Sequence, residues 1–280
     1  PGDEAIIPAP YWVSYPDMVR LAEAEPIFIP TGIDQHFKIS AEQLDAAITS
    51  KTKLLILNSP SNPTGSSYSQ AELEALGRVL EDHPNVVTVS DDIYEHIHWA
   101  DEPFMSFVTA CPALKDRIVT TNGVSKAYAM TGWRIGYAAG PQVLINAMRT
   151  VQSQSTSNPC SISQVAAEAA LDGDQGPVAE MAAAYKARHD YFVTALNDIE
   201  GFECRPGEGT FYAFPKVESA LQRKGIETDI ELVELLLNDA DVACVPGSAF
   251  GAPNYLRLSF ACSMDTLKEA VRRIKRVMSA

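Results

Sequence analysis

Lys126 is the first candidate for catalysis because of the residues around it. It lies in the run Gly123-Val-Ser-Lys-Ala127, among small and apolar side chains, directly after a predicted strand. Burial among such neighbours lowers the pKa of an amine and favours its use in Schiff-base chemistry. A solvent-exposed lysine is the alternative interpretation, because most lysines lie on the protein surface.

Asp91 and Tyr94 form a second candidate pair. Asp91 begins the motif Asp91-Asp-Ile-Tyr94, which follows the apolar run at residues 86–89. A carboxylate at the end of a strand could pair with a protonated ring nitrogen, and a single turn could direct both side chains into one crevice. The alternatives are a capping aspartate and a tyrosine that only packs in the core.

Asn62 belongs to a loop that the sequence makes rigid. The segment Asn58-Ser-Pro-Ser-Asn-Pro-Thr-Gly65 follows another apolar run, and its two prolines and its glycine exclude a helix. Such a loop can hold the Asn62 amide in one orientation. A plain turn without a catalytic role explains the same composition.

Two arginines are candidates for binding anions. Arg134 follows Lys126 by eight residues, and Arg257 lies in the run at residues 255–261, where polar and apolar residues alternate. The planar fork of a guanidinium suits the oxygens of a phosphate or carboxylate. A surface ion pair for Arg134 and a solvent-facing side chain for Arg257 are the alternatives.

The elements that position these residues have an alternating pattern. Short apolar runs at residues 5–8, 27–30, 54–57, 86–89 and 118–120 predict strands, and amphipathic segments at residues 15–24 and 69–82 predict helices between them. This alternation predicts an α/β fold with a mostly parallel sheet and crossover helices. Ligands of such sheets bind at the carboxyl ends of the strands, where Asn58, Asp91 and Asn122 lie.

The pattern changes in the last third of the chain. A long helix is predicted at residues 176–200, and after it come glycine-rich turns, short strands and helices at residues 229–239 and 264–278. We expect a large domain at residues 1–185 and a smaller α+β C-terminal domain at residues 186–280. A nucleotide-binding fold is set aside because the chain has neither a GxGxxG nor a GxxxxGK[ST] motif.

Composition limits the possible partners and the compartment. The formal charge of −14 argues against nucleic-acid binding, and no apolar run approaches the roughly 20 residues that a membrane span needs. The five cysteines show no CxxC spacing, which predicts buried free thiols in a reducing compartment, taken as the cytoplasm. The start at Pro1 shows no leader, so the chain is expected to begin within a longer protein.

A metal site is not expected. His96 and His98 alternate along the chain without a third ligand nearby in the sequence, which is poor zinc coordination. We therefore expect both histidines to have structural roles.

Four motifs occur here in the order in which one known family carries them: Asn62-Pro-Thr-Gly65, Asp91-Asp-Ile-Tyr94, Ser125-Lys126 and Gly132-Trp-Arg134. Along its whole length the chain resembles class I aminotransferases of pyridoxal-phosphate fold type I. The segments at residues 8–15 and 152–159 are similar to bacterial aspartate/prephenate aminotransferases. Relative to that family, an N-terminal segment with a glycine-rich, phosphate-binding loop is expected to be absent.

The resemblance implies a cofactor, pyridoxal 5'-phosphate, and the catalytic groups that serve it. Lys126 matches the lysine that carries the cofactor and moves the substrate proton. Asp91 matches the aspartate that keeps the pyridine nitrogen protonated. Tyr94 and Asn62 match the pair that hydrogen-bonds the phenolic oxygen, and Trp12 matches the aromatic residue that stacks on the ring.

The resemblance also implies how anions are bound. Arg257 matches the arginine for the substrate α-carboxylate, and Trp12 and Asn62 also match substrate-binding positions. Arg134 matches the phosphate-binding arginine, helped by Ser125. Several family members carry a serine where this chain has Gly123, so phosphate binding is expected to rest on the other two residues.

The resemblance implies transfer of an amino group between an L-amino acid of the aspartate or glutamate kind and a 2-oxo acid, in a homodimer. A carbon-sulfur β-lyase of the same fold is one alternative, since it uses the same cofactor set. A catalytically silent relative is the other.

Overall fold

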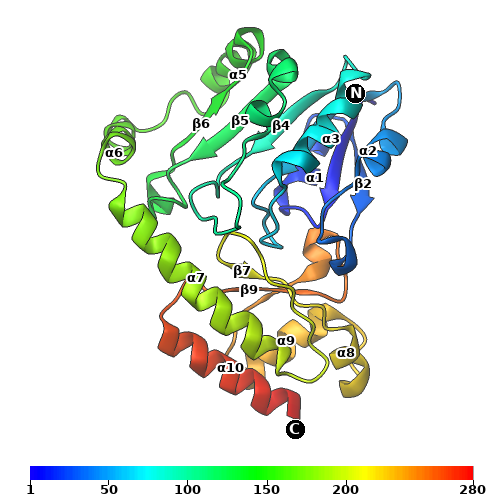
Figure 1. Cartoon of the computed structure of the whole chain (residues 1–280), viewed down its shortest axis with the longest axis vertical. Helices are drawn as coiled ribbons and strands as arrows, with labels where there is room; N and C mark the ends of the chain where they lie inside the picture. Colours follow the sequence, from blue (N-terminus) through cyan, green and yellow to red (C-terminus); the bar gives the residue numbers. More distant parts are fainter. Residues whose placement is uncertain (280) are drawn as a thin grey trace.

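A computed structural model describes residues 1–279 and contains two sheets that lie one above the other in Figure 1. The larger sheet has six strands in the order β2-β1-β3-β4-β5-β6. Their bounds are β1 Glu4–Ala9, β2 Glu25–Pro30, β3 Thr52–Asn58, β4 Val87–Asp91, β5 Ile118–Gly123 and β6 Gly136–Ala139. All five strands predicted for this part of the chain are present, and β6 adds a sixth.

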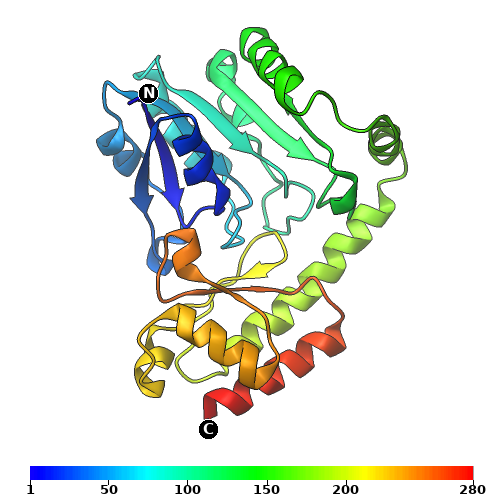
Figure 2. The ribbon, with the colours of Figure 1, turned by 180° about the vertical axis from the view of Figure 1, so that it is seen from behind.

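The first five strands of this sheet are parallel, and only β6 runs antiparallel to its neighbour β5. The predicted α/β fold with a mostly parallel sheet is therefore confirmed. Parallel neighbours end at the same edge of a sheet, so the residues that follow β3 and β4 come together at one edge. This edge faces the smaller sheet (Figures 1 and 2).

One face of the large sheet is covered by α2 Ala41–Ala47, α3 Gln70–Glu81 and α4 Phe107–Ala110. Ser40 and Ser69 cap the first two of these helices, each with a capping box that satisfies free backbone N–H groups. Leu73, Leu76 and Leu80 of α3 are buried against the sheet, which agrees with the amphipathic helix predicted at residues 69–82.

The opposite face carries α1 Ser14–Leu21, seen in front of the sheet in Figure 2. Beside this helix lies a hollow of 550 Å³, with Leu54, Ile56 and Val89 of the central strands in its lining. This face of the sheet is thus apolar and partly open.

Three helices connect the two sheets: α5 Gln142–Ser155, α6 Ser161–Asp172 and α7 Gly176–Asn197. The last one runs diagonally from the large sheet to the small one (Figure 1). It begins where the long helix was predicted, at Gly176, and ends at Asn197, three residues before the predicted end. Large apolar side chains on α5 and α6 are exposed, namely Val143, Met148, Val151, Ile162, Val165 and Leu171.

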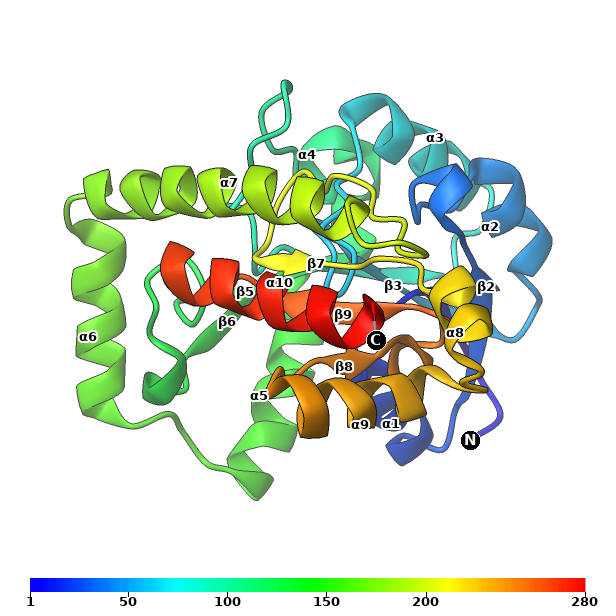
Figure 3. The same ribbon diagram turned by 90° about the horizontal axis from the view of Figure 1, so that it is seen from below.

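The smaller sheet has the order β7-β9-β8, with β7 Tyr212–Ala213, β8 Val245–Pro246 and β9 Leu256–Ser259. Below it lie α8 Glu218–Lys224, α9 Asp229–Ala240 and α10 Met264–Ser279 (Figure 3). We propose that the two domains meet within α7, near residues 185 and 186. Short 3-10 helices complete the fold at Ile33–Gln35, Pro112–Arg117, Thr131–Trp133 and Gly247–Phe250.

Residues 241–245, directly after α9, have a strand-like sequence, but the next strand, β8, begins only at Val245. Asp241 adopts a left-handed conformation with φ 52°, and the Val242 N–H donates back to the Leu236 carbonyl. This turn hydrogen-bonds a carbonyl at the C-terminal end of the helix that would otherwise have no partner, so extended structure begins only at Val245.

The cysteine prediction was partly wrong. All five cysteines are free thiols, and Cys111 and Cys204 are buried, but Cys160 is exposed at the start of α6. Cysteine spacing carries no information on burial, which here depends on how α6 leaves the sheet. Among residues 1–279, no helix is long and apolar enough to cross a membrane.

Candidate active site

A cleft of 300 Å³ lies between the carboxyl edge of the large sheet and the small sheet. Six of the eight predicted site residues line it: Trp12, Asn62, Asp91, Tyr94, Lys126 and Arg257. They come from both sheets and from five separate segments of the chain. The remaining lining residues are Tyr15, Asn58, Ile93 and Tyr212.

Lys126 lies in the turn that follows β5, and its side chain reaches the cleft. Its Nζ is 6.0 Å from the centre of the Tyr94 ring and 5.8 Å from that of Phe211, which belongs to the small domain. Burial lowers the pKa of the Lys126 amine, and the positive charges of Arg257 and Arg134 lower it further. A larger share of the amine is therefore neutral and able to act as a nucleophile or base.

Asp91 is the last residue of β4, and its carboxylate is held by donors on two sides. The Tyr15 hydroxyl donates to Oδ2 at 2.5 Å, and the Ile93 N–H donates to Oδ1 at 3.3 Å. Burial raises the pKa of Asp91, while these hydrogen bonds and the charge of Lys126 oppose that rise. The carboxylate is thus a largely buried acceptor in the wall of the cleft.

Asn58 connects the end of β4, which carries Asp91, with the loop that carries Asn62. Its Nδ2 donates to the Asp91 carbonyl oxygen at 2.8 Å, and its Oδ1 accepts from the Asn62 N–H at 2.8 Å. Because Asn58 ends the strand next to β4, one amide can reach both backbones. This bridge sets the spacing of the two segments.

Tyr94 lies in a turn three residues after Asp91, as predicted, and both side chains line the cleft. Only 2% of Tyr94 is exposed, and its hydroxyl donates to the hydroxyl of Tyr212 at 3.3 Å. Burial is the main cause that raises the pKa of Tyr94. The phenol is therefore neutral and available as a hydrogen-bond donor.

Arg257 projects from β9 toward the large domain. Its Nη1 donates to Oδ1 of Asn62 at 3.1 Å, and its guanidinium lies over the rings of Tyr212 and Phe250. The neighbouring Leu256 and Leu258 are buried on the other side of the strand, so the predicted alternation is confirmed. Arg257 thus places a cation in the cleft from the small domain.

Trp12 follows β1 and forms one wall of the cleft. Its ring packs edge-to-face on Tyr15, with centroids 5.3 Å apart at an angle of 89°. The indole face toward the cleft is a flat apolar surface suited to a planar ligand.

Ser125 and Arg134 do not line the cleft. Arg134 is exposed, adopts a left-handed conformation with φ 57°, and donates to the Thr131 carbonyl oxygen at 3.0 Å. Its charge is still close enough to lower the pKa of Lys126. The assignment of Ser125 and Arg134 to phosphate binding stays a prediction.

Gly123 lies where the backbone leaves little room for a side chain. A Cβ at this position would lie 2.8 Å from the Ile135 carbonyl oxygen and 3.1 Å from the Gly136 Cα. Gly123 pairs with Gly136 in the antiparallel ladder of β5 and β6. In this backbone a side chain at position 123 would collide with the neighbouring strand.

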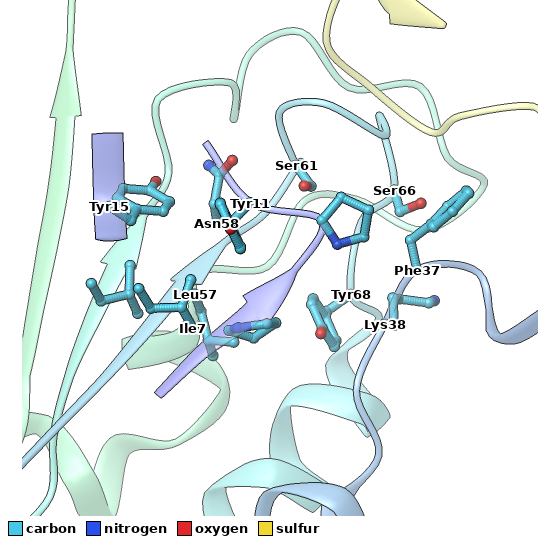
Figure 4. A pocket seen from close by; sticks show the side chains of 13 residues that line it. Ile7, Tyr11, Tyr15, Phe37, Lys38, Leu57, Asn58, Ser61, Ser66 and Tyr68 are labelled. Carbon is cyan, nitrogen blue, oxygen red and sulfur yellow. The ribbon is translucent and has the colours of Figure 1, made fainter. Parts of the chain in front are cut away.

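A second, much smaller cavity of 20 Å³ adjoins the cleft (Figure 4). Tyr15 and Asn58 line both spaces, and Ser61, Ser66 and Tyr68 add polar groups to the small cavity. Its volume suits about one water molecule. The cavity lies behind the residues that hold Asp91 and Asn62.

Four lining residues were not predicted as site residues: Tyr15, Asn58, Ile93 and Tyr212. Asn58 carried a signal, because it follows a strand at the expected ligand-binding edge. Tyr15 and Tyr212 resemble core tyrosines in the sequence, so only their tertiary contacts identify them. No group of three or more histidine, cysteine, aspartate or glutamate side chains within residues 1–279 could hold a metal ion.

This arrangement suits two kinds of ligand group at once. The aromatic wall and Asp91 fit a planar ring with a positively charged nitrogen, and Arg257 fits a carboxylate. The amine of Lys126 lies between aromatic rings from both domains and can react with a carbonyl or accept a proton. A cleft that combines an amine of lowered pKa, a carboxylate and an arginine has the groups that an enzyme acting on amino-acid-like substrates needs.

Comparison with known proteins agrees with that class. The family model described as aminotransferase class I and II matches residues 1–274. The chain therefore belongs to the class I and II aminotransferase family, as the resemblance predicted, and it is an enzyme of the aspartate aminotransferase type.

Individual relatives are similar over the whole chain. The aspartate/prephenate aminotransferase of Nitrosomonas europaea is 55% identical over 285 aligned residues, covering 100% of this chain and 72% of the relative. The crystal structure of the Rhizobium meliloti aspartate aminotransferase has a TM-score of 0.95 at 48% identity, covering 100% of this chain and 71% of that one. The structure of the Thermus thermophilus aspartate aminotransferase with maleate has a TM-score of 0.91 at 40% identity, and the match covers 99% of this chain and 70% of that one.

Proposed function

We propose that this protein transfers an amino group between a dicarboxylic L-amino acid, such as aspartate, and a 2-oxo acid, with pyridoxal 5'-phosphate as its cofactor. The observation that carries the proposal is the meeting of Lys126, Asp91 and Arg257 in one cleft. The names of the relatives support the aspartate and prephenate class of substrate.

The residues of the cleft fit the ring of this cofactor. Asp91 would accept a hydrogen bond from the pyridinium nitrogen, Tyr94 and Asn62 would donate to the phenolic oxygen, and Trp12 would stack on the ring. Ser125 and Arg134 would hold the phosphate. When bound, the cofactor supplies a protonated ring that withdraws electrons from the substrate Cα.

Proton transfer is the task of Lys126. Its amine has a lowered pKa, because it is half-buried and two arginines are near, so a larger share is neutral and could take a proton from the substrate Cα. Asp91 supports this step by keeping the ring nitrogen charged, and Tyr15 supports Asp91 through the 2.5 Å hydrogen bond.

Substrate orientation is the task of Arg257. Its planar fork would bind the α-carboxylate in a bidentate manner, which places Cα beside Lys126. Asn62 already accepts one N–H of this guanidinium, which limits its rotation.

We further infer a homodimer in the cytoplasm. Exposed apolar side chains on α5 and α6, including Val143, Val151, Ile162 and Val165, support an interface between copies of the chain. The cysteine pattern supports a reducing compartment. Sedimentation at several protein concentrations tests the oligomeric state.

The deciding experiment is the absorption spectrum of the protein with pyridoxal 5'-phosphate, followed by L-aspartate and 2-oxoglutarate. We expect a visible band that changes on addition of aspartate, with formation of glutamate. Lys126→Ala should lose both the band and the product, whereas the exposed Lys115→Ala should keep them.

Other outcomes would point elsewhere. Pyruvate and ammonia in place of a new amino acid would indicate a carbon-sulfur β-lyase. A folded protein without the band would indicate a silent relative and would contradict the proposed function.

A further inference from the structure

Tyr212 lies at the junction between the two domains, although no motif in the sequence indicates a role for it. It begins β7, is 8% exposed, and lines the cleft together with Lys126 and Arg257. Its backbone is held by pairing with Ser259 of β9 and by the hydrogen bond from its N–H to Oγ1 of Thr210. The side chain therefore enters the cleft from a fixed position.

The ring of Tyr212 contacts the guanidinium of Arg257. The Arg257 Cζ is 4.5 Å from the Tyr212 centroid and 4.9 Å from the Phe250 centroid, both within the range of cation–π attraction. A free arginine side chain samples many rotamers, and ordering it on binding weakens affinity. The two rings, with Asn62, order this side chain before a carboxylate arrives.

The hydroxyl of Tyr212 contacts the other half of the site. It accepts the hydrogen bond of the Tyr94 hydroxyl at 3.3 Å, and the two rings pack edge-to-face with centroids 6.1 Å apart. Tyr212 thus touches both the substrate-binding arginine and the phenol that would donate to the cofactor. The contact to Tyr94 joins the small domain to the large one.

We propose that Tyr212 is a positioning residue that couples carboxylate binding to cofactor binding, its ring ordering Arg257 and its hydroxyl sharing the proton of Tyr94. This inference rests on the proposed function. The ring and the hydroxyl have separate tasks, so two substitutions can separate them.

The experiment compares Tyr212→Phe and Tyr212→Leu in the cofactor-loaded protein. Maleate, a dicarboxylate that cannot be transaminated, is titrated by calorimetry, and the visible absorption is followed against pH. Tyr212→Phe keeps the ring, so the maleate Kd should stay within about twofold, whereas Tyr212→Leu should raise it about fivefold. With aspartate, Tyr212→Leu should raise KM more than it lowers kcat.

The absorption titration tests the hydroxyl. Without Tyr212 as acceptor, Tyr94 can donate fully to an anionic oxygen in the cleft, and a stronger donor stabilises that anion. The pH midpoint of the absorption change should therefore move to lower pH in Tyr212→Phe. Tyr255→Phe is the matched control, because Tyr255 stacks on Phe214 outside the cleft and should leave both measurements unchanged.

Each half of the proposal can be overturned. An unchanged maleate Kd in Tyr212→Leu would overturn the role of the ring, and an unchanged midpoint in Tyr212→Phe would overturn the role of the hydroxyl. If Tyr212→Leu does not fold, a loss of maleate affinity of about fivefold in Tyr212→Phe, which keeps the ring, would overturn the ring's role. Absence of the band in the unchanged protein would instead overturn the proposed function, and this assignment with it.

Discussion

The hydroxyl of Tyr15 lies 2.5 Å from a carboxylate oxygen of Asp91, although 76 positions separate the two residues in the chain. Tyr15 lies in the first turn of α1 on one face of the sheet, and Asp91 ends β4. A hydrogen bond to a carboxylate favours its ionised form, so Tyr15 opposes the burial that raises the pKa of Asp91.

Tyr15→Phe should weaken cofactor binding more at acid pH than at alkaline pH. Without this donor the pKa of Asp91 rises further, so the carboxylate is lost at a higher pH. We expect about tenfold weaker binding of pyridoxal 5'-phosphate at pH 6 and a smaller loss at pH 8, measured by absorption titration. Tyr11→Phe is the control, since the Tyr11 hydroxyl faces Gly251. Equal losses at both pH values would contradict the role of Tyr15.

Arg257→Lys should mainly raise the KM for aspartate. An ammonium keeps the charge but loses the planar fork that binds both carboxylate oxygens. We therefore expect KM to rise about a hundredfold, with a smaller change in kcat. Steady-state kinetics measure both constants. Arg188→Lys is a matched control, because Arg188 also lies over a tyrosine ring, that of Tyr185, but does not line the cleft. An unchanged KM in Arg257→Lys would exclude carboxylate binding by Arg257.

Asp92 is a buried carboxyl group outside the cleft. Ser90 and Ser106 each donate to it at 2.6 Å, and only 2% of the residue is exposed. Burial raises its pKa from 3.8 to about 6. The folded protein therefore binds more protons than the unfolded chain between these values, and Asp92 destabilises the fold increasingly as pH rises through that window.

Asp92→Asn should accordingly stabilise the fold at pH 7.5 by about 1–2 kcal/mol, with little gain near pH 4. Urea unfolding at both pH values measures the difference in the free energy of unfolding. Substitution of the exposed Asp101 by Asn should leave the free energy of unfolding unchanged at both pH values. A stabilisation of equal size at both pH values would show that the ionisation of Asp92 is not its cause.

Gly123→Ser should destabilise the protein by about 1–3 kcal/mol, because its Cβ would meet the backbone of β6 at 2.8 Å. Gly132→Ser is the matched control, since no atom lies within 4 Å of a Cβ there. Thermal unfolding compares the two variants. Equal melting temperatures would mean that β6 can move away without loss of stability.

Local patterns along the chain were enough to predict much of this protein. Apolar runs and amphipathic segments predicted the parallel sheet, and the position of Asp91 after a strand predicted where the cleft lies. The alternation around Arg257 predicted its direction, because side chains of a strand point to opposite faces in turn. In each case the signal is a pattern of side-chain types over a few consecutive residues.

Other features depend on contacts between distant segments. The pairing of Tyr15 with Asp91, the bridge made by Asn58, and the position of Tyr212 beside Arg257 follow from strand order and from the packing of the two domains. The exposure of Cys160 has the same origin. Residue spacing does not encode which strands become neighbours, since that order is selected by burial of the whole apolar surface, and these contacts exist only once the sheets have assembled.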